Sequence, residues 1–168
     1  KQHIITEWFA DYFLHTSDIT FDFTNDNKII VHQKHIEPWK VTVVDTGLNT
    51  MTGGRIKRIQ PYVDNETFMM TYGDAVCDVN ILDLLKYHQS HGKIATLTAV
   101  IQEQSKGVLN IGGDYAVRSF REKSSSNDIF INAGYMVLNP EIFDLIEGDD
   151  TVFERQPLES VAQKDELM

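Results

Sequence analysis

The sequence predicts an α/β fold, an open sheet flanked by helices, and three observations support this. Segments typical of strands alternate along the chain with segments whose apolar residues recur at helical spacing. The apolar run at residues 68–76 contains Gly73-Asp74, and the amphipathic segment 79–91 follows it, in the order strand, turn and helix. The chain has 168 residues, 42% of them hydrophobic, which suits one packed domain over residues 1–168.

The chain opens with a predicted helix followed by a hairpin. The helix is indicated by apolar residues at helical spacing, which are Ile5, Trp8, Phe9, Tyr12 and Phe13. Residues 19–23 and 28–31 have strand composition, and residues 24–27 between them predict a turn. The aromatic residues of this first helix suit an interface between copies of the chain, so we expect a homo-oligomer.

The next part of the chain contains the predicted central strand. A buried strand at residues 41–44 leads into a loop, 45–54, that is rich in Gly, Thr and Asn. A helix is expected next, because Ile56, Ile59 and Val63 share one face. The central strand follows at residues 67–72.

One helix is predicted with both of its ends. Asp78 is expected to cap its first turn, and Gly92 to end it. Its core face is marked by residues at i, i+3, i+4 and i+7, which are Ile81, Leu84, Leu85 and His88. His88 is therefore expected to have a structural role.

The last third of the chain is predicted to be mainly strands. These are residues 95–100, 108–111, 115–120 and 129–138, of which the two short ones form an antiparallel patch. A helix is expected over residues 142–146. Thr151 and Glu154 have the spacing of a capping box before a last helical segment, and Pro157 delays its first full turn.

Composition excludes some classes of function. The net charge of −10 argues against a nucleic-acid-binding protein, which would normally present a basic face. The chain contains no apolar run of the ~20 residues that a membrane span needs, and no secretory signal. Its single cysteine, Cys77, cannot form an internal disulfide. We therefore expect a cytoplasmic protein with no nucleic-acid or membrane partner.

Asp74 is the first candidate site residue. A strand that stops at a carboxylate places that charge at the carboxyl edge of the sheet, where open α/β folds bind ligands. Gly73 lets a ligand approach the backbone closely. Asp74 is therefore interpreted as a residue that handles a metal ion or a phosphate. The alternative is a capping aspartate, a role that Asp78 can fill.

The loop at residues 44–55 is the second candidate. It consists of small, hydroxylated and glycine residues and opens onto a helix with Arg55 in the first turn. A helix N-terminus attracts anions, and arginine there is against the preference of the helix dipole. This makes sense if Arg55 points at a phosphate, which a guanidinium can grip with two hydrogen bonds. A glycine-rich surface loop with a solvent-exposed arginine is the alternative.

Two further groups of polar residues follow strands or interrupt them. Glu122 and Lys123 come after a strand and can bind sugar hydroxyls and a phosphate, although a solvated charge cluster explains them equally well. Asn132 interrupts the apolar strand 129–135, so its amide is expected to be buried and to need partners. A ligand hydroxyl and a neighbouring backbone group are the two candidates for such a partner.

Together these motifs resemble the sugar-1-phosphate nucleotidylyltransferase family in order and spacing. The matching segments are Val44-Asp45-Thr46-Gly47, Met51-Thr52-Gly53-Gly54-Arg55, Thr71-Tyr72-Gly73-Asp74, Glu122-Lys123 and Ile131-Asn132-Ala133-Gly134. The loop around Arg55, with Glu37-Pro38-Trp39, is most similar to the branch of cytidylyltransferases that act on glucose 1-phosphate. The resemblance covers essentially the whole chain and implies a Rossmann-like (GT-A-like) mixed, mainly parallel sheet.

The resemblance also implies an activity and a set of site residues. CTP and α-D-glucose 1-phosphate would give CDP-glucose and pyrophosphate, with Mg²⁺ as cofactor, in nucleotide-sugar and lipopolysaccharide biosynthesis. The implied catalytic residues are Asp74, which would bind the metal, Arg55 and Lys123. Thr50, Gly53, Arg55 and Gly73 would lie against the nucleotide. Glu122, Lys123 and Asn132 would hold the sugar phosphate.

The family pattern is incomplete in this chain. Its N-terminal phosphate-binding loop G-G-x-G-T-R and its C-terminal metal-binding aspartate have no counterpart, so residues 1–168 are expected to be a core without both ends, inactive alone. Ser124 and Ala133 replace a proline and a glycine of the family motifs. The alternatives are a non-catalytic binding or assembly module that retains the fold, and a GT-A glycosyltransferase that uses Asp74 and Asp78.

Overall fold

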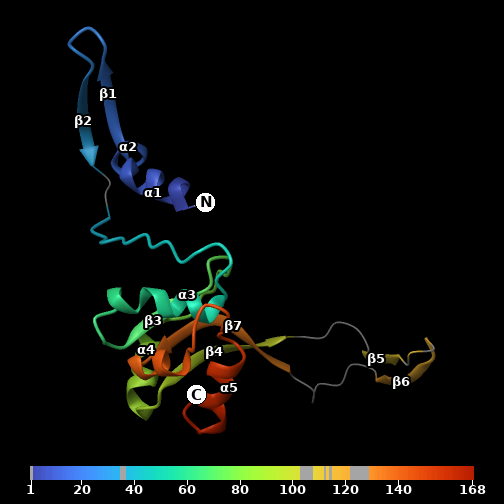
Figure 1. Cartoon of the computed structure of the whole chain (residues 1–168). Helices are drawn as coiled ribbons and strands as arrows, with labels where there is room; N and C mark the ends of the chain where they lie inside the picture. Colours follow the sequence, from blue (N-terminus) through green and yellow to red (C-terminus); the bar gives the residue numbers. More distant parts are fainter. Residues whose placement is uncertain (1, 35–36, 103–107, 112, 114, 122–128) are drawn as a thin grey trace. The chain divides into compact units, whose positions relative to one another are not determined.

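The computed structural model describes residues 2–34, 37–102, 108–111, 113, 115–121 and 129–168 (Figure 1). The chain divides into two compact units, Lys1–Leu48 and Asn49–Met168, which are described separately. The expectation of one domain over residues 1–168 stays a prediction. None of the helices that the structure describes combines the length and the apolar character that a membrane span requires.

The first unit contains two short helices and a β-hairpin. Its elements are α1 (Gln2–Ala10), α2 (Tyr12–Thr16), β1 (Ser17–Asp22) and β2 (Lys28–Lys34). The single helix predicted here is therefore interrupted at Asp11, whereas the predicted hairpin is confirmed, with β1 and β2 antiparallel. Asp26 and Asn27 turn the chain with φ values of 53° and 56°, which Asp and Asn tolerate better than most residues.

The strand predicted at residues 41–44 is wrong, because these residues form no regular element. Val41 is 46% exposed. Valine-rich composition favours an extended backbone, but a strand also needs a neighbouring strand for its hydrogen bonds. No strand of the described chain pairs with this segment.

The second unit is built on a three-stranded sheet with the order β3-β7-β4. The strands are β3 (Phe68–Thr71), β4 (Ala95–Gln102) and β7 (Ile129–Leu138). Both β3 and β4 run antiparallel to β7, so they point in the same direction on either side of it. Residues 95 and 167 add a parallel bridge at the outer edge of β4.

The α/β class is thus confirmed, and the expected predominance of parallel pairs is not found in the described sheet. The physical reason is the position of β7. A helix connects β3 to β4, as expected for parallel strands, but β7 lies between them and pairs with both in the antiparallel direction. A strand inserted from later in the sequence gives no local signal of its direction.

Helices cover this sheet. They are α3 (Thr52–Ile59), which continues into the 3₁₀ turn η1 (Gln60–Tyr62), α4 (Ile81–His91), the 3₁₀ helix η2 (Pro140–Leu145) and α5 (Gln156–Gln163). Gly92 ends α4 with a φ of 65°, as predicted. The predicted cap at Asp78 is wrong, because Asn80 caps α4 by accepting hydrogen bonds from the amides of Leu82 and Asp83.

Two further strands, β5 (Val108–Ile111) and β6 (Val117–Arg121), form the predicted antiparallel pair.

The core of the second unit lies beneath β7 and β4, where η2 and α5 pack. Its fully buried side chains include Met136, Leu138, Phe143, Phe153 and Val161. Phe68 stacks on Phe143 with 5.2 Å between the ring centroids. His88 is 2% exposed and bonds to Thr96 and Asn139, which confirms its structural role.

The capping box predicted at Thr151 and Glu154 is wrong. Helix α5 begins later, at Gln156, with Pro157 in its first turn as expected. The hydroxyl of Thr151 accepts a hydrogen bond from the amide of Gly148 (3.1 Å), and Glu154 bonds to side chains of other elements. The spacing suits a cap, but a local turn engages the side chain of Thr151 and distant residues engage that of Glu154.

Candidate functional site

A hollow of about 280 Å³ lies at the end of β3, between that strand and α3. Its lining residues come from α3, from β3 and the segment after it, and from the loop before α5, and they are Thr52, Arg55, Ile56, Met70, Thr71, Tyr72, Gly73, Asp74 and Glu154. Three residues that the sequence singled out therefore line one hollow: Arg55, Gly73 and Asp74. They come from segments about twenty residues apart in the chain.

Gly73 and Asp74 lie directly beyond the end of β3, as predicted. Both are exposed. A Cβ placed on Gly73 would meet no described atom within 4 Å, and its φ is not in the left-handed region. Packing and backbone conformation therefore do not require glycine at this position, and the open space beside the backbone remains accessible to a ligand.

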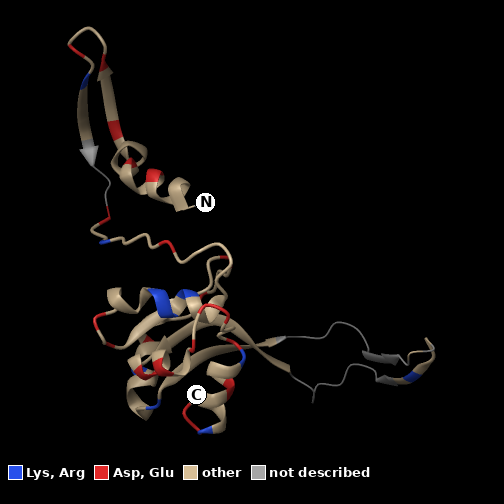
Figure 2. Ribbon diagram, in the orientation of Figure 1, with Lys and Arg blue, Asp and Glu red and all other residues tan. Residues whose placement is uncertain are grey.

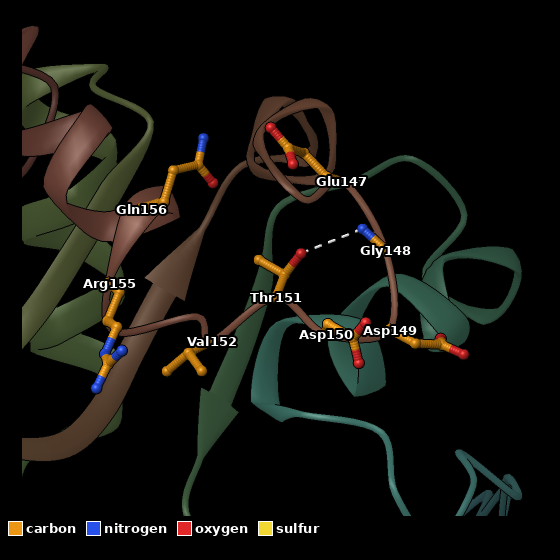
Figure 3. Close-up of a pocket in the computed structure, with 8 residues that line it drawn as sticks. All are labelled: Glu147, Gly148, Asp149, Asp150, Thr151, Val152, Arg155 and Gln156. Carbon is orange, nitrogen blue, oxygen red and sulfur yellow. Dashed lines mark hydrogen bonds between the residues drawn. The ribbon is translucent and has the colours of Figure 1, made fainter.

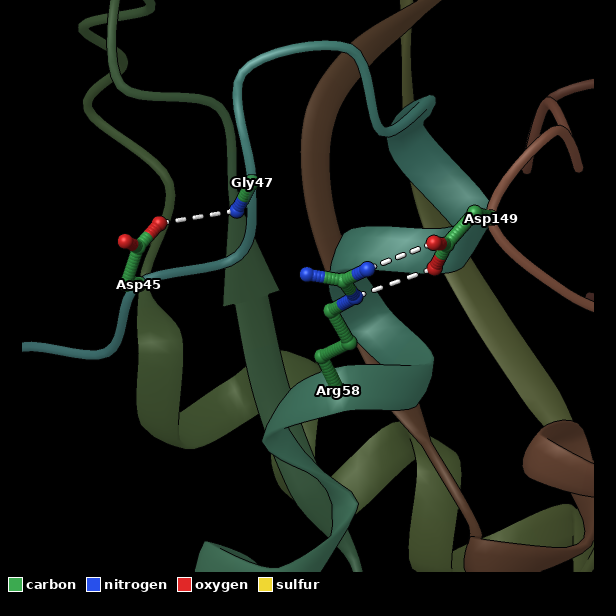
Figure 4. A network of polar contacts seen from close by, with 4 residues as sticks. All are labelled: Asp45, Gly47, Arg58 and Asp149. Atoms are coloured by element: carbon green, nitrogen blue, oxygen red, sulfur yellow. Dashed lines mark hydrogen bonds and ion pairs between the residues drawn. The ribbon is translucent and has the colours of Figure 1, made fainter.

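Helix α3 carries three cationic residues, and the Lys and Arg positions are blue in Figure 2. Of these three, only Arg55 lines the hollow. Lys57 donates a hydrogen bond to the carbonyl oxygen of Phe143 (2.6 Å). Arg58 donates hydrogen bonds to both carboxylate oxygens of Asp149, at 3.0 and 2.5 Å (Figure 4). These hydrogen bonds hold the pKa of Asp149 below its usual value. Arg55 is exposed and lies on the wall of the hollow.

The two glycines before Arg55 are explained by packing. The amide of Gly53 donates to the carbonyl oxygen of Thr151 (2.8 Å), and a Cβ on Gly53 would come within 2.7 Å of the same oxygen. A Cβ on Gly54 would lie 2.6 Å from the Cα of Asp149. Only glycine allows this approach, so the start of α3 is held directly against residues 149–151. Thr50 is 7% exposed beside Gly54. Thr50 and Gly53 do not line the hollow.

Tyr72 and Glu154 form a polar contact inside the hollow that links three elements. The hydroxyl of Tyr72 donates to Oε1 of Glu154 (2.7 Å), and the hydroxyl of Thr52 donates to Oε2 (2.7 Å). Burial, the hydrogen bond to Glu154 and its charge raise the pKa of Tyr72 to about 12. Burial alone would raise the pKa of Glu154, but the hydrogen bonds from Thr52 and Tyr72 outweigh it, so this pKa lies below its usual value.

Asn132 lies on β7 next to this contact, but it is exposed rather than buried as predicted. Its Nδ2 donates to the hydroxyl of Tyr72 (3.4 Å), and its Oδ1 accepts from the amide of Gly134 (2.8 Å). In β7, residues 129–132 are exposed and residues 136–138 are buried. A run of apolar residues therefore does not indicate burial along the whole strand. Of the two candidate partners for Asn132, the backbone group is found, and it is the amide of Gly134.

The lowered pKa of Glu154 predicts an acid dependence of stability. A carboxylate whose folded pKa is depressed stabilises the fold above its unfolded pKa, near 4.5, and this contribution is lost as the pH falls through the folded pKa. We expect the free energy of unfolding to fall less steeply in acid for Glu154→Gln than for the unchanged chain. Urea unfolding between pH 7 and pH 3 measures this difference, and parallel pH profiles would contradict it.

Two predicted residues, Glu122 and Lys123, lie outside the described residues. A larger hollow, of about 470 Å³, is lined by residues 147–152, 155 and 156 (Figure 3), and it contains none of the predicted site residues. Within the described ranges, no group of three or more His, Cys, Asp or Glu side chains is placed to hold a metal ion. The hollow at the end of β3 is therefore the candidate site.

Sequence reasoning missed Tyr72, Glu154 and Thr52 as parts of this site. Glu154 lies 82 residues from Tyr72 and 102 from Thr52 in the chain, so no local spacing connects them. Gly134 was also missed. It is buried with a φ of 81°, and a Cβ there would lie 2.5 Å from the ring of Tyr72. The one available signal was the glycine itself, at the end of the Asn132 motif.

Known proteins resemble this chain over most or all of its length. Residues 21–163 match the family model for nucleotidyl transferases. The glucose-1-phosphate cytidylyltransferase of Salmonella typhimurium is 49% identical over 169 residues, which cover 100% of this chain and 65% of that protein. A probable glucose-1-phosphate cytidylyltransferase of Bacillus subtilis is 38% identical, over 99% of this chain and 65% of that protein. The chain thus spans about two thirds of the length of these relatives.

A solved structure supports the fold. A proposed glucose-1-phosphate thymidylyltransferase from Bacillus anthracis superimposes with a TM-score of 0.50 at 13% identity, over 73% of this chain and 53% of that one. At this identity the likeness concerns the fold alone. Since the family model covers residues 21–163, which are most of the chain, the chain belongs to the nucleotidyl transferase family.

Proposed function

We propose that the protein carrying this chain is a Mg²⁺-dependent glucose-1-phosphate cytidylyltransferase, which converts CTP and glucose 1-phosphate into CDP-glucose and pyrophosphate. The observation that carries the proposal is the hollow shared by Arg55, Gly73 and Asp74 at the end of β3. The choice of base and sugar follows the names of the Salmonella and Bacillus subtilis relatives. The reaction needs no nucleic-acid or membrane partner.

The chemistry requires positive charge and alignment more than a protein nucleophile. A phosphate oxygen of glucose 1-phosphate attacks the α-phosphorus of CTP in line, the bond to the β-phosphate oxygen breaks, and pyrophosphate leaves. Two anions must approach each other, so catalysis depends on cationic groups and fixed geometry. Arg55 supplies a guanidinium that can bind phosphate oxygens at two points. The exposed backbone at Gly73 leaves room for the nucleotide against the sheet edge.

The donor set suits Mg²⁺. Asp74 contributes an exposed carboxylate to the wall of the hollow, while both oxygens of Glu154 already accept hydrogen bonds. Mg²⁺ keeps several waters and is commonly bound by one or two carboxylates together with substrate phosphates, so a single available carboxylate fits a metal that arrives with the nucleotide. When bound, it would neutralise charge on the phosphates. Asp74 is the residue that would hold it.

The remaining roles are proposed from the family resemblance. Thr50 and Gly53 contact the nucleotide from the start of α3, whose position against residues 149–151 is set by Gly53 and Gly54. Lys123 and Glu122 hold glucose 1-phosphate together with Asn132, and Lys123 shares the catalytic charge with Arg55. Asn132 is exposed beside Tyr72, where a ligand can reach it.

Two properties of the whole protein are also proposed. The apolar side chains exposed on α1, among them Ile4, Ile5 and Trp8, suit a homo-oligomer. A single cysteine and small-molecule phosphate substrates suit the cytoplasm. Sedimentation equilibrium measures the first, and fractionation of cells measures the second.

Release of pyrophosphate from CTP and glucose 1-phosphate tests the proposal directly. It should require both substrates and a divalent metal, and titration calorimetry should show CTP binding that depends on Mg²⁺. Metal-dependent CTP binding without pyrophosphate release, in a folded protein, would instead favour a non-catalytic binding module. Transfer of sugar from a nucleotide sugar, with no pyrophosphate formed, would favour a glycosyltransferase.

Substituting Arg55 with alanine should weaken CTP far more than CMP. The guanidinium is proposed to bind the phosphates beyond the first, which CMP lacks, and a charged hydrogen bond contributes about 1.5–3 kcal/mol, or roughly 10- to 100-fold in affinity. Calorimetric dissociation constants for the two nucleotides measure this. Arg58→Ala is the matched control, because Arg58 lies on the same helix but does not line the hollow. Equal losses for CTP and CMP would contradict the phosphate role.

A further inference from the structure

We propose that Tyr72 is a positioning residue for the sugar phosphate: its hydroxyl, anchored by Glu154, sets the orientation of the Asn132 side-chain amide. This inference rests on the proposed function and adds to it a residue that does not itself contact the sugar. It is built on a chain of three hydrogen-bonded side chains that come from the loop before α5, from the end of β3 and from β7.

The direction of the first hydrogen bond follows from Glu154. A carboxylate only accepts hydrogen bonds, and the two oxygens of Glu154 accept from Thr52 and from Tyr72, each at 2.7 Å. The pKa of Glu154 is held below its usual value, so the group is ionised at neutral pH. The hydroxyl hydrogen of Tyr72 is therefore committed to Glu154, and the hydroxyl can only accept from any other neighbour.

The hydroxyl oxygen of Tyr72, acting as this acceptor, sets the orientation of the side-chain amide of Asn132. The group facing the Tyr72 oxygen at 3.4 Å must be a donor, which is Nδ2. At the other end of the amide, Oδ1 accepts from the amide of Gly134 at 2.8 Å. The two contacts require the same orientation. These two hydrogen bonds leave one N–H of Nδ2 and one lone pair of Oδ1 available to a ligand on the exposed side chain of Asn132.

That remaining pair matches a sugar hydroxyl, which both donates and accepts a hydrogen bond. A rotated amide would present its groups in the reverse order and would lose both internal contacts. Orientation by Tyr72 thus prepares Asn132 for one arrangement of ligand hydroxyls before the ligand arrives, which reduces the cost of ordering on binding.

The backbone keeps Tyr72 in place. Its amide donates to the carbonyl oxygen of Gly134 (3.2 Å), and its ring lies over Gly134 so closely that a Cβ there would clash. Tyr72 also lies two residues before Asp74. The orientation of Asn132 is therefore tied to the strand end that carries the proposed metal ligand.

Binding of CDP-glucose compared with CTP tests this inference. CDP-glucose carries the sugar and CTP does not, so Tyr72→Phe should weaken CDP-glucose about tenfold and leave CTP within about twofold. Titration calorimetry on the folded variant gives both constants. Tyr87→Phe, which removes an exposed hydroxyl on α4, is the matched control and should change neither.

A double-mutant cycle separates positioning from a merely structural effect. Asn132→Ala should also weaken CDP-glucose about tenfold, and the double variant with Tyr72→Phe should bind no more weakly than Asn132→Ala alone. Glu154→Gln keeps an acceptor for Tyr72 and should bind CDP-glucose several-fold more tightly than Glu154→Ala. In NMR spectra, the side-chain amide signals of Asn132 should move in Tyr72→Phe.

The outcomes are distinguishable. If the unchanged protein binds neither CTP nor CDP-glucose, the proposed function fails and this inference fails with it. If it binds both, additive losses in the cycle, or equal losses for CTP and CDP-glucose in Tyr72→Phe, overturn the positioning role alone.

Discussion

Replacing Asp74 with asparagine should remove the Mg²⁺-dependent part of CTP binding. Asparagine has nearly the same shape, but it is neutral and offers one oxygen, so a hard divalent cation loses its charged protein ligand. Loss of a residue that only orients a metal ligand lowers metal affinity 10- to 100-fold, so we expect loss of the ligand itself to lower it about 100-fold or more. Calorimetric titrations of CTP with MgCl₂ and with EDTA measure the effect.

Stability and a neighbouring carboxylate provide the controls for Asp74→Asn. Asp74 is exposed, so thermal unfolding should be unchanged in the variant. Asp78 is an exposed aspartate four residues later that does not line the hollow, and Asp78→Asn should bind CTP as the unchanged protein does. Metal-dependent binding that survives Asp74→Asn would show that another group holds the cation.

Replacing Gly134 with alanine should destabilise the protein by about 2–4 kcal/mol, the sum of overpacking and a left-handed backbone. Gly134 is buried with a φ of 81°, and a Cβ would lie 2.5 Å from Cδ2 of Tyr72. The ring stands directly on the backbone and is held by Glu154 and Asn132, so it cannot move without breaking those contacts. The midpoint of urea unfolding measures the loss.

Gly148→Ala is the matched control for Gly134→Ala. A Cβ on Gly148 meets no described atom within 4 Å, and its φ lies outside the left-handed region. Its stability should stay within about 0.5 kcal/mol of the unchanged chain. Equal effects at the two glycines would mean that the close approach of Tyr72 to Gly134 does not limit stability.

The predictions that were confirmed depend on short-range patterns. The hairpin β1–β2 and helix α4 with its ending at Gly92 follow from residue spacing and from glycine's access to positive φ. The order of strand, Gly73 and Asp74 is equally local. Such features involve residues within one or two turns of each other, so a single sequence contains the information.

The wrong predictions depend on partners that are distant in the chain. Residues 41–44 have strand composition but no pairing strand in the described structure. Thr151 and Glu154 have capping spacing, yet Glu154 bonds to Thr52 and Tyr72 instead. Asn132 interrupts an apolar run, but that half of β7 is exposed. In each case a local rule was correct and a tertiary contact, or its absence, decided the outcome.

The candidate site shows the same division. Loop composition and position at an element's end indicate Arg55, Gly73 and Asp74, and these three residues line one hollow. The signal was sufficient because ligand sites in α/β folds gather at strand ends and helix N-termini. Thr50 and Gly53, which the family resemblance implies, are not on the wall of the hollow, and Gly53 packs against Thr151 instead.

By itself the sequence determined the α/β class, most elements of regular structure and the carboxylate and guanidinium proposed for the chemistry. Only the tertiary structure decided the direction of β7 and the contacts among Thr52, Tyr72, Glu154 and Asn132. The physical reason is the separation along the chain over which each effect acts. Periodicity and turn chemistry act between near neighbours, whereas a polar side chain takes whichever partner the completed fold brings within hydrogen-bonding distance.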